Sequence, residues 1–82
     1  MKPLGHVERE PLTPREQQVL QLLTEEHSVQ AIADILHISF RTVKNHLSSI
    51  YSKMGVLSQT AAVLRAIRSR LVEFEFDDEK GS

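Results

Sequence analysis

The 82-residue sequence predicts an all-α fold, a small four-helix bundle, and three observations lead to this prediction. Four segments each carry a start signal for a helix, followed by apolar residues at helical spacing. No segment alternates apolar and polar residues for long enough to predict a strand. The chain contains no cysteine, so neither a disulfide framework nor a thiolate metal site can stabilise so small a domain. Packed helices or self-association must do so instead.

The first helix is expected to begin directly after Thr13. Thr13 and Glu16 form a capping box, in which each side chain accepts a hydrogen bond from the backbone amide of the other residue. Pro14 occupies the first helical position, where its missing amide hydrogen costs nothing. The apolar face consists of Val19, Leu20, Leu22 and Leu23. The helix is expected to end between Glu25 and His27.

The second helix is expected to be short and to begin after Ser28, a typical N-cap residue. Its apolar residues are Ile32, Ala33, Ile35 and Leu36. His37 follows where the chain must turn, at a position that tolerates a positive φ. Ser39 is then the expected N-cap of the third helix.

The third helix is expected over about residues 40–54, and Gly55 is expected to end it. Its buried stripe consists of Val43, Leu47, Ile50 and Met54, which recur at helical spacing. Ser58 is the expected N-cap of a fourth helix over about residues 59–72. Only about three or four residues join the second and third helices, and the small Ala33 allows a close approach that Val43 fills. These features predict a helix-turn-helix.

The outward face of the third helix carries polar and basic side chains and no acid. Its residues are Arg41, Lys44, Asn45, Ser48 and Ser52. These residue types hydrogen-bond to base edges and phosphates, and a recognition helix reads bases mostly with its N-terminal half. We therefore predict base contacts by Lys44, Asn45, Ser48 and Arg41. Backbone contacts are predicted for Ser39, Thr42, His46 and Lys53. A merely solvated helix face is the alternative interpretation.

The charges of the chain are unevenly distributed, although its net charge is only −1. Residues 35–72 contain six Lys and Arg residues and no acid, whereas residues 1–34 and 73–82 carry a net negative charge. An acid-free stretch of this length in a near-neutral chain favours an anionic partner.

Several spaced blocks resemble the LuxR/GerE-type helix-turn-helix domain of bacterial transcription regulators. They are Leu-Thr-Pro-Arg-Glu-Gln-Gln-Val-Leu at 12–20, Ile-Ala at 32–33, Leu-His-Ile-Ser at 36–39, Thr-Val-Lys-Asn-His at 42–46 and Lys-Met-Gly-Val at 53–56. The resemblance implies sequence-specific binding of double-stranded DNA, with the third helix in the major groove. It also implies phosphate contacts by Ser28 and Gln30. The chain departs from the family near His27, where a glycine is usual.

The fourth helix carries an apolar arc wider than contact with the rest of the domain requires. Ala62, Val63 and Ala66 are expected to pack on the helix-turn-helix. Leu64, Ile67 and Leu71 are predicted to form a homodimer interface, with a broad core contact as the alternative. RNA polymerase is a further candidate partner.

The predicted organisation is an arm or linker over residues 1–11, the helix-turn-helix domain over 12–72 and an acidic tail over 73–82. The sequence predicts no enzyme activity, cofactor, metal, membrane or small-molecule ligand for this domain, and a place in the bacterial cytoplasm, on the nucleoid. Two alternatives stay open. One is a promoter-reading fragment like region four of a sigma factor. The other is a module that binds another regulator through the fourth helix without binding DNA.

Overall fold

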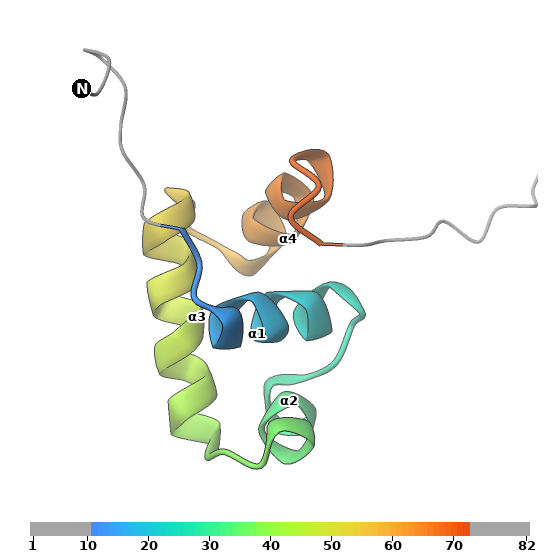
Figure 1. The fold of residues 1–82 in the computed structure, drawn as a ribbon, viewed down its shortest axis with the longest axis vertical. Coiled ribbons are helices and arrows are strands. Elements are labelled where there is room, and N and C mark those ends of the chain that lie inside the picture. The colour runs from blue at the N-terminus through green and yellow to red at the C-terminus, as the bar shows by residue number, and fades with distance from the viewer. Residues whose placement is uncertain (1–10, 73–82) are drawn as a thin grey trace, which may run out of the picture.

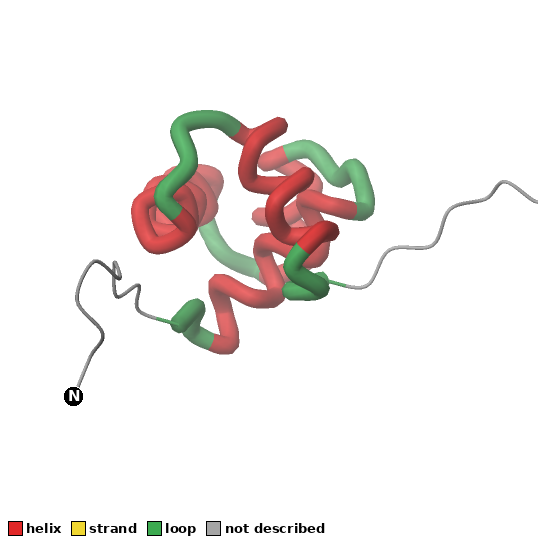
Figure 2. The backbone as a smooth tube through the Cα atoms, turned by 90° about the horizontal axis from the view of Figure 1, so that it is seen from above, coloured by secondary structure: helices red, strands yellow, loops and turns green. Residues whose placement is uncertain are grey.

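The computed structural model describes residues 11–72, which form four helices and no strand. The helices are α1 (Pro14–Thr24), α2 (Val29–Leu36), α3 (Phe40–Met54) and α4 (Gln59–Arg68). The long helix α3 runs along one side of the domain, and α1 packs against its middle, between α2 and α4 (Figure 1). Seen along α3, the other three helices all lie on one side of it (Figure 2). The predicted all-α fold is therefore confirmed, and one side of α3 is left open among the described residues.

Each helix begins directly after its predicted N-cap residue. A side-chain hydroxyl accepts a hydrogen bond from the backbone amide three residues later, at 3.0 to 3.1 Å, in Thr13, Ser28, Ser39 and Ser58. The capping box of α1 is complete, because the Thr13 amide donates to Oε1 of Glu16 at 2.9 Å. These bonds satisfy amides at the helix starts that have no partner within the helix.

The helices also share one way of ending. One residue takes up a left-handed conformation, with φ between 58° and 72°, at Glu26, His37, Gly55 and Arg70. The residue after it donates its amide hydrogen to the carbonyl five residues earlier, as Ile38 does to Ala33 at 3.0 Å and Leu71 to Ala66 at 2.9 Å. This is the Schellman motif, and it satisfies carbonyls that the helix leaves unpaired. The turn residues predicted at His37 and Gly55 are confirmed.

The predicted extent of the fourth helix is wrong at its C-terminal end. Helix α4 stops at Arg68 instead of continuing to about residue 72. The left-handed conformation of Arg70 turns the chain, and the Leu71 carbonyl accepts a hydrogen bond from the side-chain amide of Gln17 in α1. Val72 is buried against the core. Residues 69–72 include no glycine or proline that would indicate the end of the helix. The prediction therefore followed the spacing of the apolar residues and placed the end too late.

The core lies between α1 and the other three helices. All four residues predicted on the inner stripe of α3 are buried. Ala33 and Val43 are 2% and 0% exposed, as expected of a small and a large residue at the contact between α2 and α3. The link between these helices consists of His37, Ile38 and Ser39. The geometry of a helix-turn-helix is therefore present.

Residues 1–10 of the expected arm and the acidic tail over 73–82 lie outside the described residues. Within the described chain, none of the helices combines the length and the apolarity that crossing a bilayer requires.

Candidate nucleic-acid interface

The exposed side of α3 gathers the residues predicted to contact bases. The side chains of Arg41, Lys44, Asn45 and Ser48 are all exposed, and Ser52 continues the same face. The buried stripe of α3 lies on the opposite side, against the other helices. A single 15-residue helix therefore presents a guanidinium, an ammonium group, a carboxamide and two hydroxyls in one direction. No carboxylate belongs to α3.

The start of α3 brings the hydroxyl groups of Ser39 and Thr42 together. Ser39 Oγ accepts a hydrogen bond from the Thr42 amide at 3.0 Å and donates its own hydrogen to Thr42 Oγ1 at 2.8 Å. The Thr42 hydroxyl hydrogen can then be donated elsewhere, and the amides of the first turn point out of the helix. A helix N-terminus of this kind is suited to a phosphate. His46, half-buried, lies one turn beyond Thr42.

The start of α2 holds the two backbone-contacting residues that the resemblance implies. Ser28 and Gln30 are both exposed. The Ser28 hydroxyl caps α2 through the Ala31 amide. The side-chain amide of Gln30 donates to Oδ1 of Asp34 at 3.0 Å, one turn along α2. The carboxylate of Asp34 therefore holds the group that Gln30 would offer to a phosphate.

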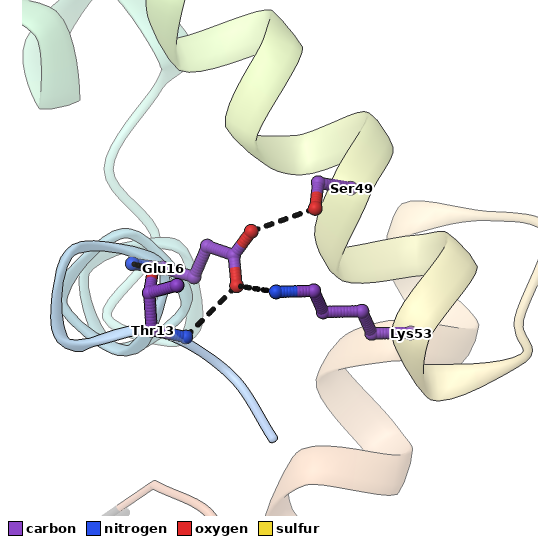
Figure 3. Close-up of polar contacts among 4 residues, drawn as sticks. All are labelled: Thr13, Glu16, Ser49 and Lys53. Atoms are coloured by element: carbon purple, nitrogen blue, oxygen red, sulfur yellow. Dashed lines mark hydrogen bonds and ion pairs between the residues drawn. The ribbon is translucent and has the colours of Figure 1, made fainter. Parts of the chain in front are cut away.

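A partly buried polar cluster joins the N-terminus of α1 to the C-terminal half of α3 (Figure 3). Glu16, only 4% exposed, extends from α1 toward α3. Its Oε1 accepts from Lys53 Nζ at 2.8 Å, and its Oε2 accepts from Ser49 Oγ at 2.7 Å. The bond from the Thr13 amide adds a third donor to the carboxylate. Glu16 thus serves two helices at once, as the cap of α1 and as the anchor of α3.

The environment of Glu16 favours its charged form. Burial by itself would raise the pKa of its carboxyl group. The hydrogen bonds from Lys53, Ser49 and the Thr13 amide, together with the charge of Lys53, outweigh burial and lower the pKa from 4.5 to about 2. The carboxylate therefore remains ionised and paired at neutral pH.

Sequence reasoning missed this cluster. It treated Glu16 only as a capping residue and Lys53 as a phosphate contact. Ser49 and Lys53 are four residues apart and share one flank of α3, which is the signal that could have indicated a common partner. The side chain of Lys53 is 17% exposed and its ammonium group is held by Glu16. A phosphate contact would have to compete with this pair, so we assign Lys53 to the packing of α1 against α3.

The three residues predicted to form a homodimer interface, Leu64, Ile67 and Leu71, do not form one continuous exposed surface on α4. Leu64 is 48% exposed and Leu71 is 38% exposed, but Leu71 follows the end of α4 and is not part of a helical stripe. Ile67 is half-buried and packs against the core. Leu64 and Ile67 both line an open groove of about 490 Å³ between α4 and the end of α1. Ala62, Val63 and Ala66 pack against the core, as predicted.

Comparison with known protein families identifies the family of the chain. Residues 10–66 match the family described as "Bacterial regulatory proteins, luxR family". The chain belongs to this family. As a LuxR-family domain it is related to regulators of transcription, and it is 47% identical over 62 residues to the transcriptional regulatory protein DegU of Brevibacillus brevis. It is 42% identical over 64 residues to the response regulator protein VraR of Staphylococcus aureus strain Mu3.

The matches cover most of this chain but a minor part of those two relatives. They span 76% and 78% of the chain, and 26% of DegU and 31% of VraR. The solved structure of the transcription factor GerE has a TM-score of 0.73 and 36% sequence identity, and the match covers 78% of this chain and 96% of GerE. A VqmA–ligand–DNA complex of Vibrio cholera has a TM-score of 0.73 and 30% identity, over 87% of this chain and 31% of VqmA. The LuxR-family helix-turn-helix fold is thus shared along nearly all of the described residues.

Proposed function

We propose that this LuxR-family domain binds double-stranded DNA sequence-specifically and thereby regulates transcription, with α3 in the major groove. The observation that carries the proposal is the exposed face of α3. It is free of carboxylates, points away from the three packed helices and begins with a capped N-terminus. An α-helix fits the width of the major groove, where base edges present distinct patterns of donors and acceptors.

The residues divide into two roles in this proposal. Arg41, Lys44, Asn45 and Ser48 contact base edges, because they are exposed in the N-terminal half of α3. Contacts with the sugar-phosphate backbone are assigned to Ser28, Gln30, Ser39, Thr42 and His46. Among these, Thr42 has the best support. Its hydroxyl oxygen accepts a hydrogen bond from Ser39, so the hydroxyl hydrogen of Thr42 is available to a phosphate.

Binding to randomised duplexes, followed by selection and sequencing, tests the proposal. The wild-type domain should enrich one short motif, and Lys44→Ala should relax the preference at one position, at a cost of about 1–3 kcal/mol. Arg68→Ala is the matched control, because it removes the same charge from an exposed residue of α4. It should leave the enriched motif unchanged. Failure of the wild type to enrich any motif would favour a module that binds another regulator without DNA.

We further propose that two copies associate through α4. Two observations support this interface. Leu64 is half-exposed, and together with Ile67 it lines the groove beside α4. A symmetric dimer would place two recognition helices on paired half-sites. Sedimentation at increasing concentration should show a dimer that Leu64→Glu converts to a folded monomer. A wild type that stays monomeric at high concentration would contradict the interface.

The partners beyond DNA follow from the same proposal. A regulator bound at a promoter has RNA polymerase as its next candidate partner, and its place is the bacterial cytoplasm, on the nucleoid. Reconstituted transcription from a template that carries the enriched motif would show whether the domain changes the yield of transcript. An unchanged yield with the motif occupied would count against a contact with polymerase by this domain alone.

A further inference from the structure

Phe40 is a large apolar side chain at the start of the exposed face of α3. It is the first residue of the helix and 47% of it is exposed. The cap of the helix is provided by Ser39, and the core cluster does not include Phe40. Neither capping nor core packing therefore accounts for an aromatic residue at this position.

The ring of Phe40 is coupled to a residue of the proposed interface. Lys44 Nζ lies over the ring, 5.9 Å from its centroid. The two residues are four positions apart, so they are neighbours on the helix surface. A cation held over an aromatic face is attracted by the ring, and this attraction restricts the rotamers of the long lysine side chain. The ring therefore influences where the Lys44 ammonium points.

The apolar surface that remains on Phe40 needs an apolar partner if α3 enters a groove. The 5-methyl group of thymine is the apolar group that the major groove presents, and phenylalanine is among the residue types that contact it. The N-terminal residues of a recognition helix are those that approach base edges. Phe40 has this position in α3 and lies beside Lys44.

We propose that Phe40 is a specificity-determining residue, whose ring contacts the 5-methyl group of a thymine while it holds Lys44 toward a neighbouring base. The inference rests on the proposed DNA binding and adds the chemistry of one recognised base. It predicts a thymine in the bound motif, next to the position that Lys44→Ala relaxes.

Replacement of single thymines by deoxyuridine tests this proposal, because it removes only the methyl group. In the duplex selected by the wild type, one such replacement should weaken binding about fourfold, the equivalent of burying one methyl-sized group. Phe40→Ala should bind the thymine and deoxyuridine duplexes equally at that position. A wild type insensitive to every replacement, or a Phe40→Ala variant with the wild-type discrimination, would overturn the proposal. If the wild type selects no duplex at all, the proposed function fails instead.

Two further variants separate the roles of the ring. Phe40→Leu keeps an apolar side chain but has no aromatic face, so it should retain the thymine discrimination and lose part of the preference at the base assigned to Lys44. A Phe40→Leu variant with the full wild-type preference at both bases would overturn the coupling to Lys44. Ile35→Ala is the matched control, because Ile35 is an apolar residue of α2 with a similar exposed fraction, 44% against 47% for Phe40. It should leave both preferences unchanged.

Discussion

Replacement of Glu16 by glutamine isolates the charge at the junction of α1 and α3. Glutamine has the same shape and can also complete a capping box, so the cap of α1 is retained. What is lost is the negative charge that faces the Lys53 ammonium at 2.8 Å. Removing one partner of a buried ion pair leaves the other charge uncompensated, which is strongly destabilising.

The size of the effect follows from the pKa of Glu16. The pKa is lowered from 4.5 to about 2 in the folded protein, a difference of about 2.5 units. At 1.36 kcal/mol per unit, ionised Glu16 contributes about 3 kcal/mol to the free energy of unfolding at neutral pH. The side chain is only 6% exposed, so solvent screening reduces this figure little. The loss is large for a domain of this size.

The pH dependence gives the sharper test. Because folding lowers the pKa, the stabilisation is complete above about pH 4.5 and is lost as the pH falls toward 2. Urea unfolding of the wild type and Glu16→Gln, followed by circular dichroism, should show a difference of about 3 kcal/mol at pH 7 and about 1.4 kcal/mol at pH 3. The difference between the two proteins cancels the titration of all other carboxyl groups that they share.

Two controls accompany this comparison. Glu25→Gln changes a carboxylate whose side chain is 48% exposed, and it should alter stability by less than about 0.5 kcal/mol. Glu16→Gln combined with Lys53→Met removes both charges and should recover part of the loss. Equal stability of the wild type and Glu16→Gln at pH 7, or a difference that does not change with pH, would refute the assignment of a stabilising ionised Glu16.

Three further changes test the local features of the fold. Glu26→Gly should raise the free energy of unfolding by about 0.5–1 kcal/mol, because Glu26 adopts φ 72° and glycine does so without strain, whereas Glu25→Gly at φ −82° should lower it. Ser39→Ala should lower it by about 1 kcal/mol through loss of the α3 cap and should weaken DNA binding, whereas the exposed Ser52→Ala should change stability by no more than about 0.5 kcal/mol. Ile50→Ala should lower the free energy of unfolding by about 2–5 kcal/mol, because Ile50 is 0% exposed. In thermal unfolding, the midpoint temperature of Ile50→Ala should be far below that of Ile35→Ala.

The sequence predicts the starts of the helices better than their ends. The hydroxyl residues at 13, 28, 39 and 58 act through bonds to amides three residues away, so the local sequence contains the whole signal. A Schellman end is visible in the sequence when glycine occupies the left-handed position, as at Gly55. Glu26 and Arg70 adopt the same conformation without that signal. The chain departs from the family near His27, where a glycine is usual, and this departure did not identify Glu26 as the left-handed residue.

One part of the candidate site could likewise be predicted from local sequence, and another part could not. The exposed face of α3 follows from helical spacing, because a helix that buries one stripe must expose the other. The partner of Lys53 could not be predicted by spacing, because Glu16 is 37 residues away and meets it only through the packing of α1 on α3. A contact of this range depends on the tertiary fold.

The cations on and beside α3 differ in what their side chains contact. Lys53 is paired with Glu16, and the Arg65 guanidinium donates to the Met54 carbonyl at 3.2 Å, where it complements the negative end of the α3 dipole. Both charges are thereby engaged at the C-terminal half of α3. Arg41 and Lys44 are left on its N-terminal half, at the positive end of the dipole. Within α3, the exposed cations therefore lie at the end where a recognition helix reads bases, although the net charge of the chain is close to zero. Arg68 and Arg70 are exposed as well, outside α3.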